Sequence, residues 1–580
     1  MTGLHISILG MGLFQLLKHI GFGNTGAGLL ALAVMLQYGM LTGGSVSAMR
    51  AVCMFLLSVG AKILGRSYDL LTALSVSAML LLLDSPAYLY SSSFLLSFGA
   101  VTGLGAVSPF LMEIAPVKRK LAKSFLSSFS VQLATLPVML VFFGEVSLAG
   151  IVLNLIVLPT VSVVLISGLC GGILGLASME AAAAAAVPGR VFLFFYEKLC
   201  VLAGKLPFCT WTGGQPRLWQ SIVYYACLTG GIAAAVWLIR RKKKRTGKKA
   251  EGSSGRAVAA LAFSAALCLG ILTLAFQDRG ELRITCLDVG QGDGIILEIP
   301  GGGAFLMDFG SSSRKNTGQY QLLPYLKSRG ITYLDGILVS HTDTDHISGI
   351  QELLELMTKD LTSIKAGTLI LPDWNSEEKA SGGHVRESPE ASGSDPSGET
   401  DGEGVEKAYG GLLELADKAG VRCVFAEQGD RLVSGQAEMK FLAPEKTASG
   451  ADVNEEGMVM ELKYGSFRAL FTGDIGEATE KSLLKKGVLS DVDFLKTAHH
   501  GSRYSTCREF LDKVRPELAV ISCSDSNNYG HPSPETVEKL EECGARIFYT
   551  MKSGAVTVCT NGERIRAEGF LSENKSFQTV

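Results

Sequence analysis

Ten apolar segments in the first half of the chain restrict its fold more than any other feature of the sequence. A helix needs about 20 apolar residues to cross a bilayer, and within the bilayer its backbone must satisfy its own hydrogen bonds. We therefore predict a multi-pass α-helical membrane domain over residues 1–276. The segments lie near residues 4–17, 27–41, 45–64, 70–83, 92–112, 125–143, 148–176, 191–203, 222–239 and 257–276.

The distribution of charge divides the chain at the same place. Residues 1–276 hold 21 Lys and Arg against 7 Asp and Glu, while residues 277–580 hold 32 against 48. A basic, membrane-like half is thus followed by an acidic half with the composition of a soluble domain. Basic loops occur at Lys18, Arg66, 118–123 and 240–249. With ten spans these loops share one side, which the positive-inside rule assigns to the cytoplasm. The acidic half is then expected outside the cytoplasm.

Arg50 is the charged residue of most interest in the membrane half. It lies near the start of an apolar segment, within LTGGSVSAMRAVCM. An arginine in this position either extends its side chain to the lipid headgroups or faces a polar cavity between helices. Both alternatives remain open from the sequence.

The second half alternates strand and helix patterns, which predicts an α/β soluble domain over residues 277–580. Apolar residues with period 2 flank a glycine-rich loop at 287–294, and residues 322–329 and 350–357 have helical patterns. Residues 375–407 interrupt this order, because they are rich in Ser, Gly, Glu and Pro and contain little that could be buried. We predict that they form a disordered surface insertion.

The stretch LVSHTDTDHISG, residues 338–349, gathers four metal-type ligands within six residues. His341, Asp343, Asp345 and His346 directly follow an apolar run that is typical of a buried strand. Two carboxylates and two imidazoles in so small a space repel and desolvate each other unless a cation lies among them. The alternative is a polar loop whose histidines are merely hydrogen-bonded. The pattern favours a metal centre at the end of a strand.

Other ligand-type residues also follow predicted strands. Together with His341 and His346, they include five of the eight histidines of the chain. Side chains gathered at the ends of several strands are what an active site on a sheet scaffold requires. The residues are Asp288 and Asp293 in DVGQGDG, Asp308 in MDFG, Asp474 in TGD, Lys496, then His499, His500 and Ser502 in HHGS, and Asn528 and His531 in NNYGHP.

In combination, HxDxDH, TGD and HHGS resemble the metallo-β-lactamase superfamily of two-metal hydrolases, with Asp343 where many members have histidine. With DVGQGD, NNYGHP, the opening TGLHISILGMG and LTGGSVSAMRA, they resemble ComEC-type DNA internalisation (competence) proteins over nearly the whole chain. The sequence departs from the family pattern at Gly294 and at 454–457. Family members usually carry further membrane segments and an OB-like domain before the position of Met1, so the resemblance implies an N-terminally shortened chain.

The resemblance implies an αββα hydrolase domain with two divalent metal ions. Such ions can activate a bridging hydroxide and stabilise both oxygens of a displaced phosphodiester. Asp343 in place of an imidazole favours Mn²⁺ or Mg²⁺ over Zn²⁺. The implied metal ligands are His341 and Asp343 at one ion, Asp345 and His346 at the other, Asp474 between them, and His499. The implied catalytic residues are Asp345, His500 and Lys496; possible supporting or substrate-binding residues are Asp288, Asp293, Asp308, Ser502, Asn528 and His531; and His5 and Arg50 are candidates for a function in the membrane domain.

We therefore expect a bacterial plasma-membrane protein for DNA uptake in natural transformation. Its helical half is expected to pass single-stranded DNA. Other DNA-uptake proteins are its expected partners, and a homo-oligomer is a further candidate assembly. Its extracytoplasmic half is expected to be a metal-dependent nuclease. One alternative is a membrane-tethered metallo-hydrolase for a small phosphoester or lactone, and another is a non-enzymatic pore with a structural metal loop. The acidic charge of the second half argues against a DNA-binding surface, which is usually basic.

Overall fold

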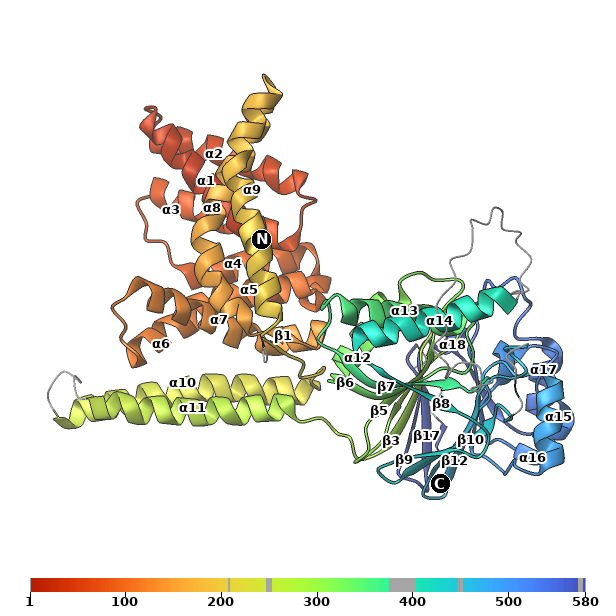
Figure 1. Cartoon of the computed structure of the whole chain (residues 1–580). Helices are drawn as coiled ribbons and strands as arrows, with labels where there is room; N and C mark the ends of the chain where they lie inside the picture. Colours follow the sequence, from red (N-terminus) through yellow and green to blue (C-terminus); the bar gives the residue numbers. More distant parts are fainter. Residues whose placement is uncertain are drawn as a thin grey trace. The chain divides into compact units, whose positions relative to one another are not determined.

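The computed structural model of the chain describes residues 2–206, 209–246, 253–374, 402–446, 448, 452–571 and 577–578. Two compact units are present (Figure 1). The first comprises Met1–Gln277 with Lys327–Gly330, and the second comprises Asp278–Leu326 with Ile331–Val580. The first unit is helical and the second is built on sheets.

In the first unit, all ten predicted apolar segments fall on helices. A two-stranded ladder of β1 (Val146–Ser147) and β2 (Thr210–Trp211) accompanies them. The helices are α1 (Thr2–His19), α2 (Asn24–Leu41), α3 (Val46–Ile63), α4 (Leu70–Asp84), η1 (Pro86–Tyr90), α5 (Ser92–Thr102), η2 (Gly103–Val107), α6 (Ser108–Ile114), α7 (Lys120–Phe143), α8 (Ala149–Gly175), α9 (Met179–Gly204), α10 (Leu218–Thr246) and α11 (Ser253–Ala275).

Within the described part of the chain, seven helices are long and apolar enough to cross a membrane, compared with the ten segments that the sequence predicts. The seven are α2, α3, the continuous helix Ser92–Ile114, α7, α8, Leu218–Arg241 of α10 and Gly255–Ala275 of α11. Among the others, α4 has only 15 residues and α9 contains Glu180, Arg190, Glu197 and Lys198. The parity argument for the side of the soluble half depended on ten spans and does not hold with seven.

The second unit contains two sheets. The nine-stranded sheet has the order β18-β17-β16-β3-β4-β5-β6-β7-β8, with β5 to β8 parallel. Its strands are β3 (Leu282–Cys286), β4 (Gly294–Glu298), β5 (Ala304–Phe309), β6 (Tyr333–Leu338), β7 (Lys365–Pro372), β8 (Arg422–Ala426), β16 (Val556–Thr560), β17 (Ile565–Gly569) and β18 (Phe577–Gln578).

The seven-stranded sheet has the order β15-β14-β13-β12-β11-β10-β9, with β12 to β15 parallel. Its strands are β9 (Arg431–Ser434), β10 (Ala437–Ala443), β11 (Val459–Tyr464), β12 (Phe467–Phe471), β13 (Phe494–Lys496), β14 (Leu518–Ile521) and β15 (Arg546–Tyr549). The remaining elements are η3 (Gly318–Leu322), α12 (Leu323–Ser328), α13 (Thr344–Thr358), α14 (Gly402–Ala419), α15 (Glu477–Lys486), η4 (Ala498–Gly501), α16 (Arg508–Val514), α17 (Pro534–Glu542) and α18 (Thr550–Ser553).

The two sheets pack face to face with helices on both outer sides (Figure 1). Side chains alternate between the faces of a strand, so that Phe305 and Met307 of β5 join the core between the sheets while Leu306 packs on the other side. There Leu306 belongs to the same buried cluster as Ile350 of α13 and Leu412 of α14. A third cluster joins the seven-stranded sheet to α15, α16 and α17. The predicted αββα fold is therefore confirmed.

Most of the predicted insertion, residues 375–401, lies outside the described residues. Its last part does not follow the expectation of disorder, because α14 begins at Gly402. This helix packs against α13 and β8 on the outer face of the nine-stranded sheet. The amphipathic pattern that begins before Leu412 was hidden by the glycine and glutamate content of the preceding residues.

Candidate metal centre

The site is assembled from loops at the ends of strands in both sheets. Asp308 is at the end of β5, and His341 follows β6, both in the nine-stranded sheet. Asp474 follows β12, and His500 lies in η4 after β13, both in the seven-stranded sheet. The last three residues of each of these strands are buried, so each chain segment emerges from the core at the same end of the sandwich.

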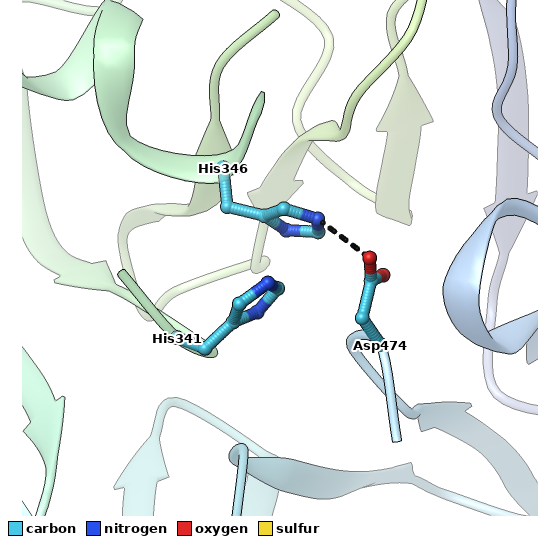
Figure 2. Close-up of side chains that lie close together, drawn as sticks. All are labelled: His341, His346 and Asp474. Atoms are coloured by element: carbon cyan, nitrogen blue, oxygen red, sulfur yellow. Dashed lines mark ion pairs between the residues drawn. The ribbon is translucent and has the colours of Figure 1, made fainter. Parts of the chain in front are cut away.

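His341, His346 and Asp474 form the cluster that Figure 2 shows. Their ligand atoms all lie within 4.8 Å of one another, and all three side chains are buried. Figure 2 shows His346 Nε2 facing Asp474, 3.3 Å from Oδ2. The centroids of the two imidazole rings are 4.1 Å apart. His341 and His346 come from the HTDTDH loop, whereas Asp474 comes from the opposite sheet.

His500 connects this cluster to a second one. Its Nε2 atom lies 3.3 Å from Asp474 Oδ2 and 3.4 Å from Asp345 Oδ2, and Asp345, His346 and His500 together could hold an ion. The Nδ1 atom of His500 lies 2.9 Å from the carbonyl oxygen of Ser522. A carbonyl can only accept, so Nδ1 carries the proton and donates it, and Nε2 presents a lone pair.

Asp308 orients His346 from behind the cluster. Asp308 Oδ2 lies 3.0 Å from His346 Nδ1, and the carboxylate also accepts hydrogen bonds from the backbone N–H of Ser340, at 2.7 Å, and from its hydroxyl, at 2.6 Å. A buried carboxylate that holds the far nitrogen of an imidazole fixes the ring and makes the near nitrogen a better ligand. Sequence analysis grouped Asp308 with the site but missed Ser340, which stands directly before His341.

The donor set fits a divalent metal. The Nε2 atoms of His341, His346 and His500, with the Oδ1 atoms of Asp474 and Asp293, are buried and have no hydrogen-bond partner within the described residues. A buried polar atom without a partner costs about 1–3 kcal/mol. Since several such atoms converge on one place, a cation that all of them can coordinate removes this cost. Imidazole and carboxylate donors in groups of three, with further positions open, are typical of catalytic metal sites.

The charges of the site lead to the same conclusion. Burial opposes protonation of the imidazoles, but the carboxylates of Asp474 and its neighbours outweigh it and raise the pKa of His500 to about 10 and that of His346 well above its usual value. Burial likewise opposes ionisation of Asp474, yet His500 and His346 hold its pKa well below the usual range. Without a cation, protons must neutralise this group, and a divalent ion supplies the same charge in their place.

A buried ion pair supports the floor of the site. Lys496 Nζ lies 2.8 Å from Asp293 Oδ2, and both side chains are 1% exposed. Burial favours the neutral amine, but Asp293 outweighs it and raises the pKa of Lys496. Asp293 Oδ1 lies 4.0 Å from His500 Nδ1, so the pair is adjacent to the ligand cluster. Lys496 was expected near the phosphate or behind the metal ligands, and its buried contact with Asp293 agrees with the second of these positions.

The adjacent histidines of HHGS have different places. Both have positive φ, 47° for His499 and 53° for His500, and Gly501 follows at 83°. Three consecutive left-handed residues make a tight turn that directs neighbouring side chains to different sides. The ligand clusters of the described residues contain His500 and not His499, whose ring packs at 5.6 Å from that of His531. We expected His499 as the ligand; the groups that could hold an ion contain His500 instead, and the ligand role of either histidine stays a prediction.

The other predicted residues lie at the margin of the site. Asp343 Oδ2 is 3.7 Å from His341 Nε2 but belongs to none of the clusters within the described residues. Asp288 pairs with Arg314 at 3.1 Å. Ser502 is buried, with its hydroxyl accepting from the Tyr504 backbone N–H. His531 is half-buried, and burial together with His500 and His499 lowers its pKa to about 4.

The roles expected of two further residues, Asn528 and His5, stay predictions. Asn528 is exposed, and the neighbouring Asn527 holds the loop instead: its amide group donates to the carbonyl oxygens of Ser524 and His531, and its side-chain oxygen accepts from the His531 backbone N–H. In a sequence of two consecutive asparagines, no local signal distinguishes them. His5 lies in α1, but its side chain is outside the described residues.

Two known protein families match this chain, one over its helical half and one over its sheet-built half. Residues 287–415 match the model of the Metallo-beta-lactamase superfamily, in agreement with the αββα fold of the second unit. Residues 1–243 match the family described as Competence protein. The chain is therefore similar to the competence proteins in its helical half and to the metallo-β-lactamase superfamily in its sheet-built half.

Two relatives match over most of this chain. ComE operon protein 3 of Bacillus subtilis is 26% identical over 96% of the chain and 66% of its own length. Recombination protein 2 of Haemophilus influenzae is 25% identical over 90% of the chain and 62% of its own length. The chain thus spans slightly less than two thirds of these relatives. Among solved structures, the metallo-β-lactamase fold protein YhfI of Bacillus subtilis is 12% identical, with a TM-score of 0.28, and covers 46% of this chain and 95% of its own.

Proposed function

We propose that the soluble unit is a metal-dependent phosphodiesterase that cleaves DNA, and that the whole chain acts in DNA uptake. The observation that carries the proposal is the convergence of three unpartnered imidazole nitrogens and the Asp474 carboxylate on one buried place. The competence proteins that the chain resembles support DNA as the substrate. The proposed ions are two Mn²⁺ or Mg²⁺ rather than Zn²⁺, because carboxylates contribute much of the donor set.

In this proposal the ligands of one ion are His341, His346 and Asp474, and those of the other are Asp345 and His500 with Asp474 between them. When bound, the ions supply a nucleophilic hydroxide and stabilise the charge on the phosphate oxygens. Asp308 and Ser522 orient the imidazoles through Nδ1. Asp293 and Lys496 form a buried ion pair next to the metal ligands. In this proposal Lys496 therefore acts through Asp293 and does not touch the substrate.

The proposed location of the soluble unit is the outer side of the plasma membrane. The basic run at 240–249 follows the candidate span Leu218–Arg241, and the candidate span Gly255–Ala275 comes directly after it. The positive-inside rule assigns such a run to the cytoplasm, and the following span then carries the rest of the chain outward. This argument uses only the last two spans and is independent of their total number. The test fuses a reporter that works only in the cytoplasm after Phe276. Activity of this reporter would overturn the proposed outer location.

The membrane unit is proposed to pass single-stranded DNA as a homo-oligomer, with other DNA-uptake proteins as partners. Its seven apolar helices exceed what a simple membrane anchor requires. This separates the proposal from a membrane-tethered hydrolase for a small phosphoester or lactone, which needs no elaborate helical domain.

The test is DNA cleavage by the purified full chain in detergent, with Mn²⁺, Mg²⁺ or Zn²⁺ added to metal-free protein. Single-stranded DNA, double-stranded DNA and a small phosphodiester are tested as substrates in separate reactions. We expect metal-dependent cleavage of DNA that Asp345→Ala abolishes, whereas Asp512→Ala, at an exposed carboxylate, retains the wild-type rate. Hydrolysis of the small ester without cleavage of DNA would contradict the proposed substrate, and inactivity of metal-loaded protein on all substrates would contradict the hydrolase.

A further inference from the structure

A cavity of about 550 Å³ lies between helices of the membrane unit. Its walls come from α1, α3, α5, η2, α7 and α8, with Tyr68 and Leu70 at the start of α4. Most of the lining is apolar, and polar side chains from several elements join it. The polar lining residues are Arg50, Ser58, Tyr68, Ser124, Ser127, Ser128 and Asn154.

Among the described residues, Arg50 is the one charged residue in the lining, and no Asp or Glu lines it. Its Nε atom donates to Ser97 Oγ at 2.6 Å, one terminal nitrogen contacts Met54 Sδ at 3.4 Å, and the guanidinium lies 5.9 Å from the centre of the Phe98 ring. A hydroxyl, a thioether and an aromatic ring orient the guanidinium but do not neutralise it. Because a cation among membrane helices is costly without a counter-charge, the cavity is complementary to an anion.

The donors around Arg50 restrict the kind of anion. A guanidinium presents a planar fork of N–H groups that matches two oxygens of a phosphate. The serine hydroxyls, the Tyr68 hydroxyl and the Asn154 amide line the same space and can donate to further oxygens. One positive charge balances the single charge of a phosphodiester, whereas a phosphomonoester carries about two. The volume is within the range of sites that hold ligands larger than a bare phosphate.

We propose that this cavity binds one phosphodiester group, with Arg50 as its charge partner. Two sources of this group reach a membrane protein, a nucleic-acid strand and a phospholipid headgroup. The nucleic-acid source rests on the proposed function, in which a single strand passes through this unit. The phosphodiester site itself depends only on the cavity and its lining.

The first arm of the test measures binding of a fluorescent oligothymidylate to the full chain in neutral detergent with EDTA present. The variants are Arg50→Gln and Asn154→Asp, which places a carboxylate in the cavity while leaving Arg50 and its Ser97 contact intact. Arg190→Gln, an exposed arginine on α9 outside the lining, is the matched control. We expect about tenfold weaker binding in both cavity variants and a change below twofold in the control. The slope of log affinity against log salt should fall by about 0.7, the value for one phosphate contact to a single strand.

The second arm replaces the oligonucleotide with phosphatidylglycerol and counts retained lipids by native mass spectrometry. Loss of one lipid in both cavity variants, with oligonucleotide binding unchanged, supports the phosphodiester site and overturns the nucleic-acid source. Unchanged binding of both probes in both cavity variants overturns the site. DNA cleavage by the wild-type chain is measured separately, so that failure of the proposed hydrolase is distinguished from failure of this inference.

Discussion

Asp308 Oδ2 lies 3.0 Å from His346 Nδ1, and the same carboxylate is held by the backbone N–H and the hydroxyl of Ser340. The imidazole is therefore fixed at one nitrogen, and its Nε2 atom faces Asp474. The contacts of Asp308 and Ser340 thus position the imidazole of His346, which the sequence motif identifies as a candidate ligand but does not orient.

Replacing Asp308 by Asn should weaken metal binding by about 10- to 100-fold, because an amide is a poorer acceptor for Nδ1–H and its N–H₂ group opposes the Ser340 backbone N–H. Metal affinity is measured by competition with a chromophoric chelator on metal-free full chain. Asp512→Asn is the control, since this carboxylate is exposed. Equal affinity in wild type and Asp308→Asn would show that His346 is not a ligand or needs no support.

His500→Ala and His499→Ala are a matched pair that separates the two adjacent histidines. We expect His500→Ala to lower the metal content of the full chain by one ion, because Nε2 of His500 converges with Asp345 and Asp474. His499→Ala should retain both ions, although contact with DNA can still suffer. Inductively coupled plasma mass spectrometry after gel filtration gives the ion count. Loss of an ion from the His499 variant alone would reverse the assignment.

Lys496→Met should destabilise the soluble unit by about 3–5 kcal/mol, because it leaves the buried Asp293 carboxylate without a partner. The double variant Lys496→Met with Asp293→Leu removes both charges and should recover much of this loss. Urea-dependent pulse proteolysis of the full chain reports the unfolding midpoint. Lys513→Met, at an exposed lysine, is the control. A Lys496→Met variant with the wild-type midpoint but weaker DNA binding would indicate a direct role with substrate.

Glu480 gives the soluble unit a pH-dependent stability. This buried carboxylate accepts the backbone N–H groups of Thr506 and Cys507, at 2.6 and 2.7 Å, in the loop after HHGS. Burial outweighs these bonds and raises its pKa to about 7. A raised folded-state pKa means that the stabilisation is complete below the unfolded value, near 4.3, and is lost as the pH rises through about 7.

Relative to Glu480→Gln, which cannot ionise, the wild type should therefore lose up to about 3 kcal/mol of unfolding free energy between pH 5 and pH 8. The same pulse-proteolysis experiment, repeated across this pH range, measures the difference. Glu509→Gln, at an exposed glutamate, should run parallel to wild type. A difference between wild type and Glu480→Gln that does not change with pH would contradict the raised pKa.

The fold was predictable from the sequence because its signals are repeated many times. Apolar segments in the first half and alternating strands and helices in the second are each supported by many residues, so single errors do not change the class. The number of membrane spans was less certain, since α4 and α9 are helical and apolar in part but differ from the seven candidates in length or charge.

The grouping of the site residues was also accessible, because ligand-type residues follow buried strands. The position of each individual side chain could not be predicted. His499 and His500 are distinguished only by the backbone of a left-handed turn, and Lys496 differs from a substrate-binding lysine only through its contact with Asp293, distant in sequence. Such assignments depend on packing between the two sheets, which no local pattern records.

The candidate metal centre draws its donors from both sheets, with Asp293 and His500 at the two ends of the sequence range involved. No subset of the chain that forms one sheet alone can complete the coordination. Because ligand convergence waits for these long-range contacts, a partly folded second unit cannot assemble the candidate metal centre. Metal binding would then depend on the two sheets having already packed against each other.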